Sequence, residues 1–127
     1  MIRETRIGVT TTGSGGSATG NATAGLHGVI DSIYVTYHAS APATTDVVIT
    51  WLDGAGATRE TLWTKNNSVT AHVARPRVAV TDNANSPTGA YDYYSIPYGS
   101  NIKVAVTGCD ALTDAVVVYA VIEESNT

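Results

Sequence analysis

Apolar and polar residues alternate along most of this chain with a period of two, the pattern of strands that bury one face. In the run from His27 to His38, for example, Val29, Ile33 and Val35 fall on one side and Tyr34 and Thr36 on the other. The alternation predicts strands over 2–10, 27–38, 46–52, 58–65, 69–73, 77–81, 91–96, 101–107 and 115–123. The last run is apolar on both faces, which favours a central strand or burial against a second sheet or a neighbouring subunit.

Turn residues separate these runs. Asp53-Gly54 between two strand-like runs predicts a hairpin, because both residues accept a positive φ at low cost. Pro76 predicts an edge, a bulge or a bend, since proline cannot donate to a sheet ladder. Further turns are expected at 66–68, 83–89, 98–100 and 108–113, the last closing a hairpin. With no helical periodicity, this spacing predicts an all-β sandwich or jelly roll of about eight antiparallel strands.

One stretch is neither a strand nor a tight turn. From Thr10 to Gly25 the chain reads TTTGSGGSATGNATAG, with no charge and no large side chain. Such a composition offers little apolar surface to offset the entropy of ordering. Two interpretations stay open, a long mobile surface loop and an arm that orders against another subunit. The chain is accordingly divided into an N-terminal strand with a flexible Gly-rich arm, 1–26, and a β-sandwich domain, 27–127.

The composition supports an all-β protein. The chain has 127 residues with 19 Thr and 15 Val, it has no Phe, and Gln is missing. Branched side chains lose rotamer freedom in helices and pack well on pleated sheets. This length corresponds to one domain with a core of its own.

Charge narrows the function classes. Charged residues make up 14% of the chain, and seven Lys and Arg against eleven Asp and Glu give a net charge of −4. A net acidic protein is poorly suited to bind phosphate backbones, so nucleic acid is not an expected partner. The longest apolar runs are too short to span a membrane, so a membrane is not an expected partner either.

No catalytic, cofactor or metal motif emerges. Gly13, Gly15 and Gly16 are not followed by a helix, so they do not form a dinucleotide-binding turn. His27 and His38 lie on different segments from His72, with no ligand spacing. No nucleophile with a paired base or acid–base pair can be named. We expect no enzyme activity, no cofactor and no metal.

Aromatic residues are the most informative candidates for a site. Tyr91, Tyr93, Tyr94 and Tyr98 lie within eight residues, and Trp51 and Trp63 lie on the two strands of the predicted Asp-Gly hairpin. Because the chain has no Phe, we first expect these side chains to fill the core. A protein interface is the second interpretation and a platform for sugar rings is the third. Candidate interface residues are these six aromatics together with Ile2, Ile7 and Val9 of the first strand.

Three stretches carry a resemblance to a known group of proteins. They are GSATGNATAG (16–25), GVIDSIYVTYHASAPATTDVVI (28–49) and IKVAVTGCDALTDAVVVYAVI (102–122), with 38–46 the most distinctive part. Over about 13–122 the chain resembles small β-rich head decoration, or cement, proteins of tailed bacteriophages and prophages. The resemblance rests on the general run of residues in these stretches and on no functional motif, so no binding residue is assigned from it.

The resemblance implies a structural virion protein made in the bacterial cytoplasm. Such a protein binds the outer capsid surface and clamps neighbouring major capsid subunits, with a homotrimer as the expected oligomer. Two alternatives stay open: a carbohydrate- or receptor-binding module on the virion surface, and a tail or connector component. A glycan is the expected ligand only for the first alternative.

Overall fold

A computed structural model describes residues 1–13, 15–21 and 26–124. Within these residues the chain forms strands and no helix, which confirms the all-β prediction. No helix able to cross a membrane occurs among them. The strands are β1 (Ile2–Val9), β2 (Ala18–Asn21), β3 (Leu26–Tyr37), β4 (Asp46–Leu52), β5 (Thr58–Lys65), β6 (His72–Ala74), β7 (Arg77–Thr81), β8 (Pro87–Tyr93), β9 (Ser95–Thr107) and β10 (Val116–Glu123).

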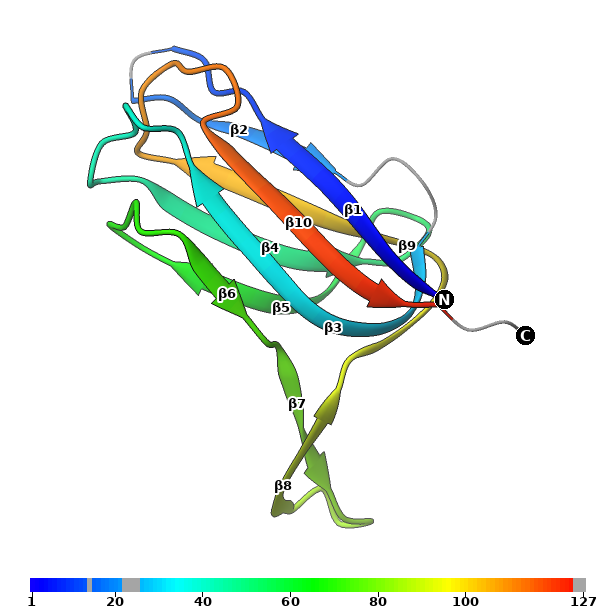
Figure 1. Cartoon of the computed structure of the whole chain (residues 1–127). Helices are drawn as coiled ribbons and strands as arrows, with labels where there is room; N and C mark the ends of the chain where they lie inside the picture. Colours follow the sequence, from blue (N-terminus) through cyan, green and yellow to red (C-terminus); the bar gives the residue numbers. More distant parts are fainter. Residues whose placement is uncertain (14, 22–25, 125–127) are drawn as a thin grey trace.

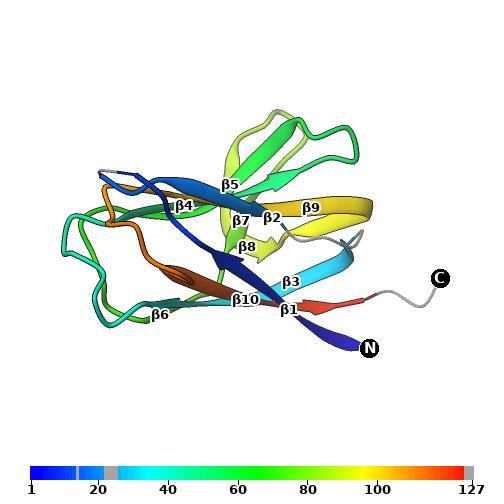
Figure 2. The same cartoon turned by 90° about the horizontal axis from the view of Figure 1, so that it is seen from above.

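The strands form two packed layers and a projecting hairpin. Figure 2 shows β1, β10, β3 and β6 in one layer and β2, β9, β4 and β5 in the other. Every pairing between these strands is antiparallel. The core between the layers consists of aliphatic side chains without accessible surface, among them Ile30, Ile33, Val35, Ile49, Ile102, Val104 and Val118. Burying each such side chain contributes roughly 1.5–3 kcal/mol.

Strand β9 belongs to both layers. Its first residues pair with β3, from Ser95 to Ser100, and the rest pairs with β4, from Asn101 to Thr107. The turn predicted at 98–100 is therefore wrong, because the strand bends there without ending. Gly99 has a φ of +90°, which glycine adopts without the penalty of a Cβ. The predicted strand 101–107 is the second half of a longer strand.

The connection 108–115 also differs from its prediction as a hairpin. It joins β9 to β10, which do not pair with each other: the half of β9 before the connection pairs with β4 and β2, whereas β10 pairs with β1 and β3. The chain therefore crosses here from one layer to the other. The prediction of a central last strand is confirmed, since β10 lies between β1 and β3.

The Asp-Gly hairpin is confirmed with its predicted bounds. Strand β4 pairs with β5, and the Asp53 carboxylate accepts hydrogen bonds from the backbone N–H of Ala55 and Ala57, both at 2.9 Å. The same arrangement closes the β7–β8 hairpin. There Asp82 accepts from the N–H of Ala84 at 2.8 Å and of Ser86 at 3.0 Å. An Asp side chain at the first turn position thus fixes both loops.

The described part of the Gly-rich segment packs on the chain's own sandwich, and the ordering of this segment against another subunit stays a prediction. The Thr11 N–H donates a hydrogen bond to the Leu112 carbonyl at 3.1 Å, and the Leu112 N–H donates to the Thr11 hydroxyl at 3.0 Å. A Cβ on Gly16 would lie 2.5 Å from the Asp110 carbonyl oxygen. Small residues permit this close approach. Residues 14 and 22–25 of the segment lie outside the described residues.

The first two strands form part of the sandwich. Strand β1 pairs with β10 along its full length, and β2, which the sequence did not predict, pairs with β9. Ile7 and Val9 are 2% and 1% exposed. Both therefore belong to the core of the monomer, and neither is available at its surface.

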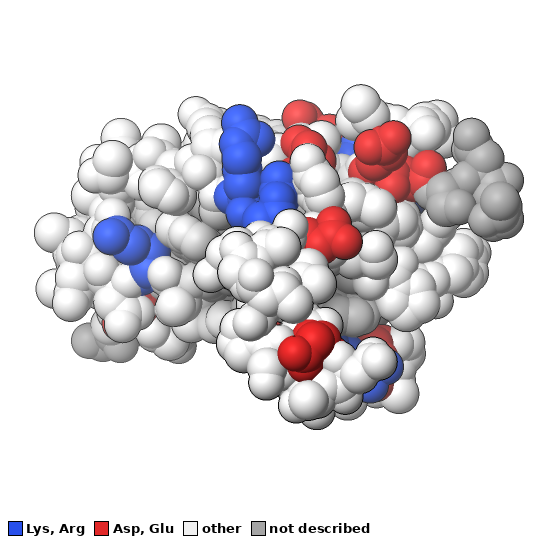
Figure 3. All heavy atoms as spheres, turned by 90° about the horizontal axis from the view of Figure 1, so that it is seen from below, with Lys and Arg blue, Asp and Glu red and all other residues white. Residues whose placement is uncertain are grey.

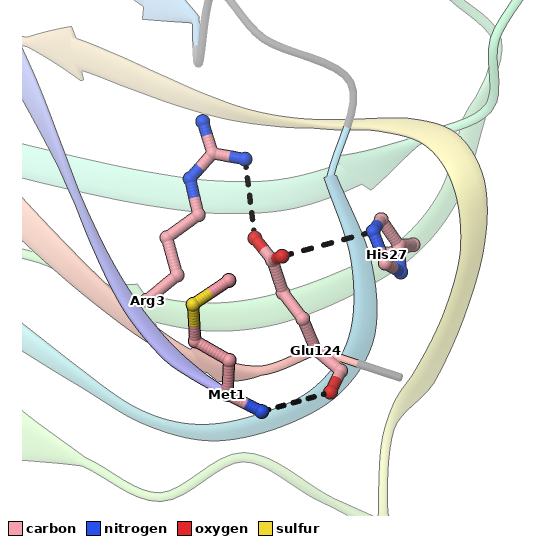
Figure 4. A network of polar contacts seen from close by, with 4 residues as sticks. All are labelled: Met1, Arg3, His27 and Glu124. Carbon is pink, nitrogen blue, oxygen red and sulfur yellow. Dashed lines mark hydrogen bonds and ion pairs between the residues drawn. The ribbon is translucent and has the colours of Figure 1, made fainter. Parts of the chain in front are cut away.

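A polar network fastens the ends of β1, β3 and β10 (Figure 4). The Glu124 carboxylate accepts a hydrogen bond from the Arg3 guanidinium at 3.2 Å, and its other oxygen lies 3.8 Å from Nε2 of His27. The Met1 amino group donates to the Glu124 carbonyl at 3.3 Å. The Glu124 side chain is 12% exposed, so these part-buried contacts bring the three strand ends to one place.

Gly28 allows β9, β3 and β10 to converge beside this network. Its φ is +119°, and a Cβ would lie 2.1 Å from the Glu123 carbonyl oxygen. Gly28→Ala should therefore lower the free energy of unfolding by at least about 2 kcal/mol, through strain and displacement of the neighbouring strand.

Urea denaturation measures this effect, with Gly54→Ala as the control. A Cβ on Gly54 would meet its nearest atom at 3.6 Å, an ordinary contact. The control should stay within about 0.5 kcal/mol of the natural chain. Equal stability of the two variants would contradict the role given to Gly28.

Candidate functional site

The β7–β8 hairpin projects beyond the two layers of the sandwich (Figure 1). Every residue from 79 to 93 is exposed. Tyr91, Tyr93 and Val80 keep 69%, 43% and 37% of their surface accessible. The predicted strand 91–96 is wrong in its bounds, because β8 spans 87–93 and the chain leaves the hairpin at Tyr94. Pro76 separates β6 from β7, which confirms the predicted break.

Two contacts hold the base of the hairpin to β3. On the β7 side, the Arg77 guanidinium donates to the Asp31 carbonyl at 3.2 Å. On the β8 side, the Ile30 N–H donates to the Tyr94 carbonyl at 2.9 Å. Arg77 also lies directly opposite Tyr93, with its guanidinium carbon 3.8 Å from the ring centre. Such a cation–π contact contributes about 0.5–1 kcal/mol at an exposed site.

A groove opens between this base and the edge of the sandwich. Its volume is about 470 Å³, and it is lined by Trp51 of β4, Arg59 and Glu60 of β5, Val78 of β7, and Tyr93, Tyr94 and Ser95 where β8 passes into β9. Trp51 thus meets the consecutive residues Tyr93 and Tyr94, which lie far from it in the sequence. We call this hollow the aromatic groove.

Trp51 and Tyr94 are half-buried against the core, and their exposed parts face the groove. Trp51 lies directly opposite Glu60 in the sheet register. Its Nε1 is covered and has no hydrogen-bond partner among the described residues. Burial raises the pKa of the Tyr94 phenol, and the Glu60 carboxylate raises it further. The phenol therefore stays protonated at neutral pH and can donate a hydrogen bond.

The other candidate residues lie apart from the groove. Ile2, at the start of β1, is 72% exposed. Trp63 is half-buried and stacks on His72, with the rings 5.5 Å apart. Tyr98 is 83% exposed and lies beside His27, near the start of β3. The first interpretation of the tyrosines, as core side chains, is therefore wrong for Tyr91, Tyr93 and Tyr98.

Two further hollows have similar sizes but simpler linings. One, of about 540 Å³, is lined by Gly28, Val29, Ser95, Ile96 and Pro97 with the rings of His27 and Tyr98. The other, of about 460 Å³, is lined by residues 65–68, Thr70 and His72 and has no Trp or Tyr. Only the aromatic groove, of these three, combines several aromatic rings with charges of both signs.

Charge is sparse on the side from which the hairpin projects. Figure 3 shows a few acidic and basic groups there on a mostly uncharged surface. Among the described residues, no three His, Cys, Asp or Glu side chains lie close enough together to hold a metal ion. His38 accepts a hydrogen bond from the Ser40 N–H at 2.9 Å, and Asp114 pairs with Arg6 at 3.1 Å.

The comparisons with known proteins identify no relative. No family model matches the chain, and no curated protein matches it. Solved structures with some likeness are an arabinose-bound GH51 α-L-arabinofuranosidase (TM-score 0.46, 11% identity) and the C-terminal family 22 carbohydrate-binding module of Clostridium thermocellum Xyn10B (TM-score 0.35, 15% identity). A CocE/NonD family hydrolase from Staphylococcus aureus has a TM-score of 0.31 and 10% identity.

The coverage of these structures differs widely. The likeness to the arabinofuranosidase covers 89% of this chain but 18% of the enzyme. The likeness to the binding module covers 98% of this chain and 87% of the module, and the likeness to the hydrolase covers 97% of this chain and 33% of the hydrolase. At these scores none of the three supports a functional argument, and the site is argued from its own geometry.

Arg77→Ala tests whether the hairpin base is held as described. Loss of the bond to Asp31 and of the contact with Tyr93 should raise hydrogen exchange of the 78–92 amides about tenfold. Amides of the sandwich should keep their protection. Arg59→Ala is the matched control, since it removes the same charge from β5. Unchanged exchange in the hairpin of Arg77→Ala would show that other contacts hold it.

Proposed function

We propose that this protein is a structural component of a bacteriophage virion that decorates the outer capsid surface and clamps neighbouring major capsid subunits. The observation that carries the proposal is the projecting β7–β8 hairpin. It extends beyond a sandwich whose own core is complete, and its two strands expose the apolar and aromatic side chains of Val80 and Tyr91. The sequence resemblance to phage decoration proteins agrees with this assignment.

The energetics of the hairpin favour a partner. A two-stranded hairpin without a packed face is marginally stable in water. A protein surface placed along it would bury Tyr91 and Val80, the most exposed apolar side chains beyond its base. Tyrosine suits such a contact, because its ring buries apolar area while its hydroxyl keeps a hydrogen bond. A rigidly attached sandwich and a projecting hairpin give one molecule two contact regions, as a clamp between subunits requires.

In this proposal the partner is the major capsid protein and the decoration unit is a homotrimer. A protein that binds only the assembled shell stabilises it by mass action. Binding of this kind needs neither a cofactor nor catalysis. It also suits a weakly charged surface, where apolar contact and shape contribute more than electrostatic attraction.

Reconstitution tests the proposal. Particles are prepared from the phage or prophage whose genome carries the gene, with that gene deleted, and purified protein is added back. The protein should co-sediment with the shells and raise the temperature at which they open. Tyr91→Ala combined with Val80→Ser should weaken shell binding at least about tenfold, because both side chains lie at the proposed contact.

Tyr98→Ala is the control for this experiment. It removes a tyrosine that is more exposed than Tyr91, at 83% against 69%, and that lies in β9 outside the hairpin, so the variant should bind shells as the natural chain does. Shells that never take up the protein would contradict the capsid role. Uptake with equal affinity by all variants would leave the capsid role intact and remove the hairpin from it.

A further inference from the structure

The aromatic groove has the chemistry of a small-molecule site, and its lining does not include Tyr91 or Val80 of the hairpin strands. From its residues we propose that it binds a neutral saccharide. The sandwich supplies Trp51, Arg59 and Glu60, and the hairpin base supplies Val78, Tyr93 and Tyr94. The proposal concerns the isolated protein and does not depend on the capsid role.

The aromatic part of the groove suits a sugar ring. Trp51 and Tyr94 are packed against the core on one side, so each presents a fixed surface to the groove. A pyranose ring carries C–H groups on its faces and hydroxyl groups around its rim. The faces can pack against aromatic rings through dispersion and burial of apolar area. The rim then meets the polar groups at the groove edge.

Those polar groups match hydroxyls better than a charged ligand. Arg59 only donates hydrogen bonds, ionised Glu60 only accepts them, and the Tyr94 phenol does either. Sugar hydroxyls also donate and accept, so they can satisfy all three. A phosphate or carboxylate would gain from Arg59 but be repelled by Glu60 beside it. One charge of each sign in the lining therefore favours a ligand without net charge.

Size and rigidity agree with this class of ligand. The volume of about 470 Å³ falls within the roughly 300–1,000 Å³ of pockets that hold small molecules. The two walls are joined through β3, by the bonds of Asp31 to Arg77 and of Ile30 to Tyr94. A groove with fixed walls loses less conformational entropy when a ligand binds.

Tryptophan fluorescence provides the test. In Trp63→Phe the remaining indole, Trp51, reports on the groove. This variant is titrated with four neutral tetrasaccharides: cellotetraose, xylotetraose, mannotetraose and maltotetraose. At least one should change the Trp51 emission with saturation. Calorimetric titration of the natural chain with the same sugars gives a second measurement that does not depend on the substitution.

Two double variants of equal net charge then locate the binding. Arg59→Ala with Glu60→Ala removes the polar rim from exposed positions and should weaken binding at least about tenfold. Arg75→Ala with Glu123→Ala removes one charge of each sign elsewhere and should bind as the natural chain does. No saturable response to any of the four sugars, by fluorescence or calorimetry, would overturn the proposal, as would equal weakening by both variants.

Light scattering distinguishes the remaining occupant, a second copy of this chain. If another protomer fills the groove, Arg59→Ala with Glu60→Ala will lower the mass in solution and no sugar will bind, and the saccharide proposal is then wrong. A sugar response with unchanged mass supports it. Failure of shell decoration would leave this result unaffected, because the titrations use the free protein.

Discussion

The course of strand β9 through both layers is the constraint on which the rest of the structure depends. Its first half completes the layer of β3, and its second half forms the middle of the layer of β4. The two sheets are therefore joined by continuous hydrogen bonding as well as by their shared core. The hairpin enters β9 directly at Tyr94, so the same strand fixes where the hairpin leaves the sandwich. Two glycines make it possible for β9 to pass from one layer to the other. Gly99 allows the strand to bend, and Gly28 of β3 leaves room for the backbone of β10.

This arrangement gives the molecule two surfaces of different character. The strands of the hairpin present Tyr91 and Val80 to the outside, which suits a large partner surface. The hairpin base and the sandwich edge enclose the aromatic groove, which suits a small ligand. Arg77 serves both, because it holds the base of the hairpin to β3 while it covers the Tyr93 ring. A capsid-surface protein with a saccharide groove would combine the two open interpretations of its sequence.

The sequence predicts those features that local chemistry determines. Asp53-Gly54 is sufficient to place the β4–β5 hairpin, and the two-faced apolar run of β10 includes a central position among its expected places, which is where the strand lies. The bend at Gly99 was predicted as a turn, because a local pattern does not show that the strand exchanges one partner for another. Strand β2 was missed since it lacks apolar alternation and depends on β9 for its hydrogen bonds. Tyr91 and Tyr93 also could not be placed from the sequence. They are exposed because β8 belongs to a hairpin that projects from the core, and no local pattern shows this.

The central claim is that the protein lies on the outside of a phage head with its hairpin against a neighbouring subunit. Electron cryo-microscopy of the deleted particles, before and after the protein is added back, tests this most directly. We expect added density on the outer capsid surface at three-fold positions, with the β7–β8 hairpin in contact with a major capsid subunit. Added density at the tail or the connector, or density on the capsid in which the hairpin points freely into solvent, would contradict the account.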